Sequence, residues 1–464
     1  MLLHIFETGI FLPAYRRQLL VTLSAILITF CHGIGLGWLS PMLPRLQSPE
    51  QTPLSFVIDV QEASWLGALI SLGGVTGNFC FSFIMNRFGR KVALYGLALP
   101  HTCIWFLLYF ATSIEWLYVA RVCAGLTGGG TFVVLPIFIG EIADNRIRGR
   151  LCSFFNLAIN TGIMVGFVVA AHVPYHLIPQ IVVALPLLYL LLCLRYPETP
   201  QQLLRWGDEA AAQRSLKYYC NCSSVALDKD AQKQFEEMRQ AIEQQLKQSN
   251  GLGLSCADFC NKRALQAILT GLVLMIGNIF TGTFAFINYM TSIFERVHTQ
   301  LPPDTNTIII GAVQILGTLA SIYLVDRYGR KLLLIVSFAG SAFGTTAFGI
   351  YAFYAEETSV NLSAVSWLPL LLMAIIIFVA NVGIISVTMV VLVEVLPPKI
   401  RAVATSACLG SLSFFAFTSL KTFPIMMATL GLAATMWCCA AVCALCLFYV
   451  VVWLQETKGK SMYE

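Results

Sequence analysis

Twelve apolar runs, each long enough to cross a lipid bilayer, occupy most of this 464-residue chain. A helix needs about 20 apolar residues to cross about 30 Å of hydrocarbon. Only 11% of the residues are charged, against about 25% in soluble domains, which excludes a water-soluble enzyme. Backbone polar groups in lipid must be satisfied within a helix or a closed barrel, and the runs are too long for barrel strands, so we predict an all-α membrane protein. The predicted spans are 18–41, 62–85, 92–113, 115–139, 151–172, 177–195, 264–294, 305–325, 332–354, 367–393, 402–424 and 431–453.

The positions of Lys and Arg predict which ends of these spans face the cytoplasm. Of the 29 basic residues, 25 fall in the two tails and the even-numbered connections, whereas only Arg45, Arg296 and Lys421 fall on the other side. Loops rich in Lys and Arg stay in the cytoplasm, so we expect both termini to be cytoplasmic. The net charge of +5 then reflects membrane topology and does not favour nucleic-acid binding.

Three motifs occur twice, in the same order and each at the cytoplasmic end of a span. The copies are Asn86-Arg-Phe-Gly-Arg-Lys91 and Asp326-Arg-Tyr-Gly-Arg-Lys331, Glu141-x6-Arg148 and Glu394-x6-Arg401, and Pro197-Glu-Thr-Pro200 and, more weakly, Gln455-Glu-Thr-Lys458. Same-sense repetition predicts two six-helix halves with a solute site between them near the membrane midplane. We expect an N-terminal half at 1–195, a cytoplasmic linker with short helices at 196–263 and a C-terminal half at 264–464.

The charged residues of these motifs predict a cytoplasmic gate. Arginines and carboxylates at the mouth of the two halves would pair when the mouth closes and separate when it opens, which biases a two-state equilibrium. The alternative is that the basic residues only anchor helix ends at the membrane surface. Topology alone requires no placed carboxylates, so we favour the gate. The predicted gate residues are Arg87, Arg90, Glu141, Arg148, Asp326, Arg327, Arg330, Glu394 and Arg401.

Taken together, the motifs resemble those of one transporter family. Besides the repeats, the chain carries Gly-Trp-Leu-Ser-Pro41, Arg121-x3-Gly125 and Leu-Lys-Thr-Phe-Pro424. Across essentially its whole length the chain resembles the sugar porters of the major facilitator superfamily, and among them the facilitated trehalose transporters. The resemblance implies a major facilitator fold and facilitative transport of a sugar, trehalose or a hexose, by alternating access.

The resemblance also implies where the solute binds, and at several of those positions this chain departs from the family pattern. Amides are retained in kind at Asn156, Asn278 and Gln314, in spans five, seven and eight. The family's second Gln and its Asn in span seven are replaced by Ile279 and Phe284. Span ten lacks the family's two prolines and tryptophan, and span eleven has Leu412-Ser413 in place of Asn-Trp.

A desolvated hydroxyl without a partner costs about 1 to 3 kcal/mol, so the lost amides would weaken a sugar site. Other polar residues of the spans can restore those bonds, or can instead form ordinary interhelical hydrogen bonds. The candidate solute-binding residues are Asn156, Asn278, Gln314, Asn160, Asn288, Thr388 and Met389. A less hydroxylated neutral solute and a non-transporting solute sensor on the same fold are the alternative functions.

Three further expectations concern the spans themselves. Without its prolines, span ten should be straighter and stiffer. Span one contains no Asp or Glu between Arg17 and Pro41, which favours uniport over proton symport, and we interpret His32 as a packed neutral side chain. Arg121 is costly inside a membrane, so we expect it to be paired or to face water.

The remaining expectations concern modification and partners. Asn361-Leu-Ser363 lies in a predicted outer loop and is a candidate glycosylation site, whereas Asn221-Cys-Ser223 lies on the cytoplasmic side. No catalytic set, cofactor motif or metal-ligand spacing is present in the sequence. We expect a monomer in the plasma membrane whose partners are a small solute and the lipid bilayer.

Overall fold

The computed structural model describes residues 15–144, 147–221, 229–249, 259, 261–358, 360–397 and 400–456. The first helices are α2 (Arg16–Ala25), α3 (Leu27–Gly37), α4 (Leu39–Gln47), α5 (Val60–Phe88), α6 (Arg90–Tyr109), α7 (Ile114–Ile142), α8 (Arg148–His172), α9 (Leu177–Val182) and α10 (Ala184–Cys193). The next are α11 (Pro200–Arg205), α12 (Glu209–Tyr219) and α13 (Lys229–Ser249). The last are α15 (Lys262–Phe280), α16 (Thr283–Arg296), α17 (Pro303–Tyr328), α18 (Arg330–Glu357), η2 (Ser363–Val365), α19 (Leu368–Ala380), η3 (Asn381–Ile385), α20 (Ser386–Val395), α21 (Arg401–Thr429) and α22 (Gly431–Val452).

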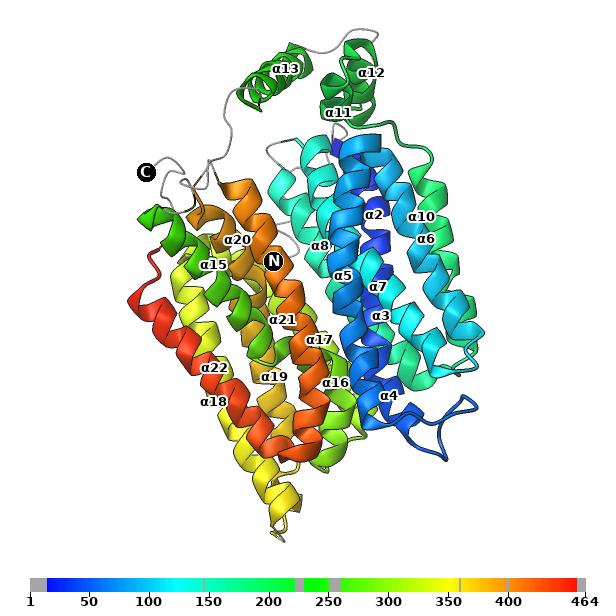
Figure 1. Ribbon diagram of the computed structural model, residues 1–464, viewed down its shortest axis with the longest axis vertical. Coiled ribbons are helices and arrows are strands. Elements are labelled where there is room, and N and C mark those ends of the chain that lie inside the picture. The colour runs from blue at the N-terminus through cyan, green and yellow to red at the C-terminus, as the bar shows by residue number, and fades with distance from the viewer. Residues whose placement is uncertain are drawn as a thin grey trace.

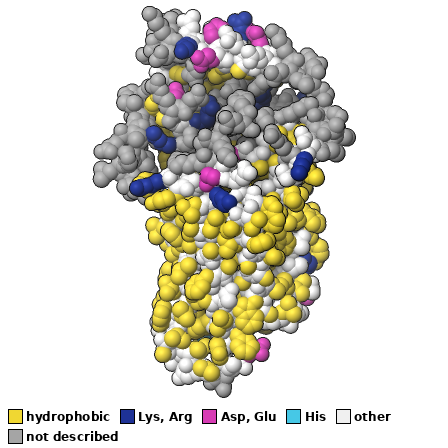
Figure 2. Space-filling model, turned by 90° about the vertical axis from the view of Figure 1, so that its left-hand side faces the viewer, with side chains coloured by type: hydrophobic (Ala, Val, Ile, Leu, Met, Phe, Trp, Pro, Cys, Tyr) yellow, Lys and Arg dark blue, Asp and Glu magenta, His cyan; other side chains and the backbone are white. Residues whose placement is uncertain are grey.

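Two groups of long helices stand side by side, with α11 to α13 above one end of them (Figure 1). We call α2 to α10 the N-half helices, α15 to α22 the C-half helices, the end beside α11 to α13 the linker end, and the opposite end the far end. Figure 2 shows a broad band of hydrophobic side chains on one face, with Lys and Arg side chains gathered toward the linker end. Such a band is what a protein surrounded by lipid presents.

Eleven of the described helices are long and apolar enough to cross a membrane. They correspond to all the predicted spans except the sixth, at 177–195. There the chain forms the shorter apolar helix Leu177–Cys193, which consists of α9 and α10. The count of twelve spans therefore remains a prediction.

Glycines set the spacing between the most closely packed N-half helices. Gly33 and Gly37 on α3 face Gly162 and Gly166 on α8, and a Cβ added at any of the four would lie closer than 3.0 Å to a backbone atom of the other helix. The same relation joins α5 to α7, through Gly73 and Gly77 on one side and Gly125 and Gly129 on the other. All four pairs have the small-xxx-small spacing that lets helix backbones approach closely in lipid.

The two halves meet mainly along three helix pairs, α5 with α21, α8 with α17, and α4 with α16, and α3 also touches α16. Several hydrogen bonds cross this boundary toward the far end. Ser40 Oγ on α4 accepts from the Thr291 N–H on α16 at 3.1 Å, and Lys421 Nζ on α21 donates to Ser64 Oγ on α5 at 2.7 Å. Arg45 forms an ion pair with Asp304 at 2.8 Å. In this conformation the far end is therefore held together by direct bonds between the halves.

The predicted tenth span is not a regular helix. Its middle, Asn381–Ile385, is a π-helical turn, so the expectation of a straighter span is wrong, whereas its stiffness stays a prediction. Ser337 of α18 explains the irregularity, because its hydroxyl donates to the Val379 carbonyl and accepts from the Ile384 N–H at 3.1 Å. A side chain inserted into the backbone ladder is a common cause of such turns. Loss of the prolines has therefore not produced an uninterrupted helix.

The glycine contacts generate a stability prediction for α7. We expect Gly125→Ala to lower the melting temperature of the purified protein, because the new Cβ would overlap the Ile70 carbonyl oxygen of α5. Gly140→Ala is the matched control on the same helix, since a Cβ there meets nothing within 4 Å and alanine favours a helix by up to about 1 kcal/mol. Equal melting temperatures for the two variants would contradict backbone contact between α5 and α7.

Candidate functional site

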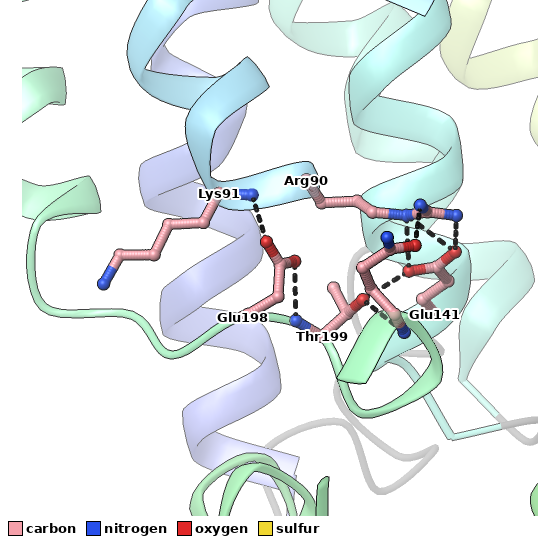
Figure 3. A network of polar contacts seen from close by, with 6 residues as sticks. Arg90, Lys91, Glu141, Glu198 and Thr199 are labelled. Atoms are coloured by element: carbon pink, nitrogen blue, oxygen red, sulfur yellow. Dashed lines mark hydrogen bonds and ion pairs between the residues drawn. The ribbon is translucent and has the colours of Figure 1, made fainter. Parts of the chain in front are cut away.

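The repeated motifs of the N-half meet in one buried ion pair at the linker end. Arg90 begins α6, and its Nε lies 3.0 Å from both carboxylate oxygens of Glu141 on α7, while its Nη2 lies 2.6 Å from Oε1 (Figure 3). The two residues are only 2% and 9% exposed. Such a two-pronged arginine–carboxylate contact is strong and geometrically specific. The paired motifs thus build a rigid junction between α6 and α7.

The Pro197–Pro200 segment completes this junction from the linker. Thr199 Oγ1 donates to Glu141 Oε2 at 2.5 Å, and Arg90 Nη1 donates to Gln202 Oε1 of α11. Glu198 accepts from the backbone N–H of Lys91 at 3.0 Å and of Thr199 at 2.8 Å, as Figure 3 shows. The carboxylate therefore satisfies the otherwise unpaired N-terminus of α6. Burial raises the pKa of the Glu198 carboxyl, although these N–H donors act in the opposite direction.

Gly89 allows the Glu198 carboxylate to reach that helix end. Its φ of +95° lies in a region that other residues rarely adopt. A Cβ at this position would also overlap Glu198 Oε2 and the ring of Trp206. The glycine of the Arg-Phe-Gly-Arg-Lys motif is thus required by both backbone conformation and space.

The C-half repeats this arrangement with an ion pair that is more exposed to solvent. Glu456 accepts from the backbone N–H groups of Arg330 at 3.0 Å and Lys331 at 3.1 Å, at the start of α18. Arg330 Nη2 lies 3.1 Å from Glu394 Oε1, with the two side chains 17% and 22% exposed. Among the described residues, the buried Nε of Arg330 has no hydrogen-bond partner. The C-half pair is thus more exposed than its N-half counterpart.

Both ion pairs join residues of the same half. Of the other predicted gate residues, Arg87, Arg148 and Arg327 are exposed at the linker end, and Arg327 Nη1 donates to Tyr323 Oη at 2.8 Å. The side chains of Asp326 and Arg401 lie outside the described part of the chain. The sequence interpretation missed Glu198, Thr199, Gln202 and Glu456 as members of these junctions. The recurrence of Glu-Thr after the sixth and twelfth predicted spans was the signal that pointed to Glu198, Thr199 and Glu456.

A second polar cluster joins the two halves near the middle of α8 and α17. Gln314 Nε2 on α17 donates to Asn160 Oδ1 on α8 at 2.7 Å, and Asn160 Nδ2 donates to Thr318 Oγ1 on α17 at 2.6 Å. All three side chains are buried. The structure thus places two predicted solute-binding amides in direct contact.

Arg121 lies at another crossing point between the halves. Its guanidinium donates to the carbonyls of Leu66 on α5 and Gly35 on α3, at 2.9 and 3.1 Å, and to Asn288 Oδ1 on α16 at 3.4 Å. The side chain is 3% exposed. Arg121 is therefore paired with neutral oxygens, and within the described residues it forms no ion pair. Asn288 Nδ2 in turn donates to the Phe284 carbonyl at 2.9 Å.

The remaining predicted solute-binding residues are spread over α8, α15 and α20. Asn156 is exposed on α8, one turn from Asn160. Asn278 Nδ2 on α15 donates to the Ile384 carbonyl of the π-helical turn at 3.1 Å. Thr388 is buried on α20, and its hydroxyl has no partner within the described part of the chain. The neighbouring Met389 packs against apolar side chains of α15 and α21.

The predicted glycosylation site lies at the far end. Asn361 is exposed just before η2, and its Oδ1 accepts from the Ser363 N–H at 3.0 Å. The described residues contain no group of three or more His, Cys, Asp or Glu side chains that would hold a metal ion. Neutral amides and hydroxyls between two helical halves, with ion pairs at one end, are suited to binding and releasing an uncharged polar solute.

Known proteins share both the sequence pattern and the fold. The facilitated trehalose transporter Tret1 of Bombyx mori is 29% identical over 419 residues, which cover 90% of this chain and 81% of that protein. Tret1 of Polypedilum vanderplanki is 28% identical, with 97% and 88% covered. The inward open conformation of the xylose transporter XylE from E. coli superposes with a TM-score of 0.76 at 21% identity and covers 96% of this chain and 98% of that one.

These similarities confirm the predicted all-α membrane class and the major facilitator fold, which XylE also has. The model of the family described as "Sugar (and other) transporter" matches residues 20–464. That match begins within α2 and runs through the rest of both halves, including the two ion-paired junctions and the amide cluster. The chain belongs to the sugar (and other) transporter family, a family of carriers and not of enzymes.

Proposed function

We propose that this protein carries a neutral sugar across a membrane by facilitated, alternating-access transport. The observation that supports this most directly is the buried cluster of Asn160, Gln314 and Thr318 between the halves of a sugar transporter family chain. Amides and hydroxyls both donate and accept hydrogen bonds, as sugar hydroxyls require of their partners. Relatives of this chain are named facilitated trehalose transporters, so trehalose or a hexose is the proposed solute.

The proposed solute contacts follow from the polar groups that line the inner helices. Asn156 is exposed, and the buried Thr388 hydroxyl has no partner among the residues that the structure describes, so both can bind a solute without first breaking another contact. Asn278, Gln314 and Asn288 have internal partners that a solute would replace, and Asn160 is the internal partner of Gln314. Met389 would supply apolar contact beside them.

A less hydroxylated neutral solute is the second candidate. Ile279 is buried where the resemblance leads us to expect a glutamine, and Phe284 lies where it leads us to expect an asparagine. Apolar side chains at these positions offer no partner to a hydroxyl, and each desolvated hydroxyl left unpaired costs about 1 to 3 kcal/mol. A solute with fewer hydroxyls would lose less binding free energy at these positions. A solute sensor that does not transport remains the rival class, and an uptake measurement separates it from both.

We also propose how the chain lies in the membrane. The chain crosses the membrane twelve times, with Leu177–Cys193 as the sixth span, so both termini lie in the cytoplasm. The linker 196–263 is also cytoplasmic and joins an N-terminal half at 1–195 to a C-terminal half at 264–464. A helix of this length is at the short limit for crossing hydrocarbon. The far end, with its bonded halves, then faces outward, so this conformation is closed to the outside. We place the protein in the plasma membrane as a monomer with a glycan on Asn361.

The two linker-end ion pairs have different roles in the proposed alternating-access transport. The Arg90–Glu141 pair is almost fully buried and joined by Thr199 and Gln202, whereas the Arg330–Glu394 pair is partly exposed. Breaking a buried pair leaves an uncompensated charge, but a partly exposed charge regains water. We therefore assign Arg90–Glu141 to the stability of the N-half and Arg330–Glu394 to the moving part of the gate.

Uptake of radiolabelled trehalose and glucose into proteoliposomes tests the transport proposal. We expect saturable uptake that an inward proton gradient does not accelerate, because helices α2 to α4 carry no Asp or Glu. Gln314→Ala should reduce the uptake about tenfold by removing a donor to the solute. The control Thr418→Val should not, because the Thr418 hydroxyl donates to the Phe414 carbonyl of its own helix. Folded protein that takes up neither sugar would contradict sugar transport and favour the sensor.

Two glutamine variants test the assignment of the ion pairs. Glu141→Gln should destabilise the protein by about 3 kcal/mol or more, and Glu394→Gln by about 1 kcal/mol or less while changing the rate of uptake. Thermal unfolding and uptake, compared with the exposed control Glu357→Gln, measure both effects. Equal loss of stability would contradict the ranking, and unchanged kinetics in Glu394→Gln would remove that pair from the gate.

The two glycosylation sequences test the orientation. In a eukaryotic cell, glycosidase treatment should increase the electrophoretic mobility of the wild-type protein, and Asn361→Gln should abolish that change. Asn221→Gln should leave it intact, because Asn221 lies at the linker end, on the proposed cytoplasmic side. A glycan on Asn221 would mean that the proposed orientation is inverted.

A further inference from the structure

The amide cluster between α8 and α17 consists of one N-half side chain held by two C-half side chains. Gln314 and Thr318 are one helical turn apart on α17, and Asn160 reaches between them from α8. Asn160 accepts from the first at 2.7 Å and donates to the second at 2.6 Å, and Thr318 Oγ1 donates to the Gln314 carbonyl at 3.0 Å. The Asn160 amide is thus bonded through both its oxygen and its nitrogen.

This contact lies in a closely packed part of the boundary. A Cβ added at Gly311 of α17 would lie 3.1 Å from the Phe167 ring and 3.2 Å from Cβ of Met164, which is one turn from Asn160 on α8. The three polar side chains are 8%, 2% and 3% exposed. Amide groups this deeply buried must find partners within the protein, because water does not supply them.

We infer that Asn160 takes the place of the solute in the empty carrier and occupies the hydrogen-bonding groups of Gln314 and Thr318 until a polyhydroxylated solute displaces it. An amide that donates and accepts at once presents the same pair of functions as a sugar hydroxyl. The inference rests on the proposed transport of a neutral sugar and names Asn160 as the residue that sets its affinity and selectivity. A solute that offers no acceptor for Gln314 Nε2 cannot displace Asn160 without leaving that donor unpaired.

The same contact also ties the two halves together when no solute is bound. The bonds run from an N-half helix to a C-half helix, so α8 and α17 cannot separate until they break. A bound solute that replaces Asn160 removes this tie. The loaded carrier therefore reorients more readily than the empty one, which means that solute exchange is faster than net uptake.

Asn160→Val tests the inference by removing the internal competitor. Equilibrium binding of radiolabelled trehalose and glucose to the purified full-length protein should become about three- to tenfold tighter, as expected for the loss of one or two interhelical hydrogen bonds. The ratio of exchange to net uptake should fall toward one. Thr161→Val is the matched control, because the hydroxyl of this adjacent residue donates to the Leu157 carbonyl of its own helix, α8.

Weaker binding in Asn160→Val would overturn the inference, since Asn160 would then be an ordinary solute contact. A test without solute keeps the inference separate from the sugar proposal. The melting temperatures of Asn160→Val, Gln314→Leu and the double variant should be strongly non-additive if the two side chains bond each other. Additive shifts would overturn the inference whatever the solute. If the wild-type protein binds neither sugar while the melting temperatures remain non-additive, the proposed sugar substrate is contradicted. The bond between Asn160 and Gln314 that joins the two halves would still be supported.

Discussion

Apolar helices gain no hydrophobic free energy when they pack together in lipid, so the helices of this protein are held together by close packing and interhelical hydrogen bonds. In the N-half the packing contacts are backbone to backbone, at Gly33 and Gly162 between α3 and α8 and at Gly73 and Gly125 between α5 and α7. The approach of these helix pairs fixes the positions of the side chains between them. Arg121 on α7 donates to the Leu66 carbonyl of α5, the helix against which α7 packs through these glycines. The polar groups of the carrier therefore depend on residues that have no side chain.

The charge of Arg121 shows how such a scaffold tolerates a buried cation. Its donors meet two helix carbonyls and the side-chain oxygen of Asn288, which come from three different helices. A charge inside a membrane needs dipoles or a counter-charge around it, and here the dipoles are supplied by neighbouring backbone. Because Asn288 belongs to the C-half, the same arginine also links the two halves.

The sequence predicts well those features that depend on short stretches of chain. Apolar length identifies the spans, and the doubled motifs and the family resemblance lead to the fold and the family. The linker-end junctions could not be predicted in this way, because Glu198 accepts a hydrogen bond from Lys91, which lies more than a hundred residues away in the sequence. The π-helical turn depends on Ser337, which lies on another helix, and no rule about proline in span ten refers to it. Likewise, Asn160 and Gln314 come together only through the relative placement of two halves that no local pattern encodes.

The π-helical turn at Asn381–Ile385 also changes how the chain should be compared with its relatives. One extra residue in a helical turn rotates everything that follows by about 100° around the helix axis. The side chains of α20, Thr388 and Met389 among them, therefore point in different directions from those of an unbroken helix with the same residue count. A comparison of solute sites that matches positions along the sequence must allow for this change of phase before it decides which side chain of α20 faces the solute.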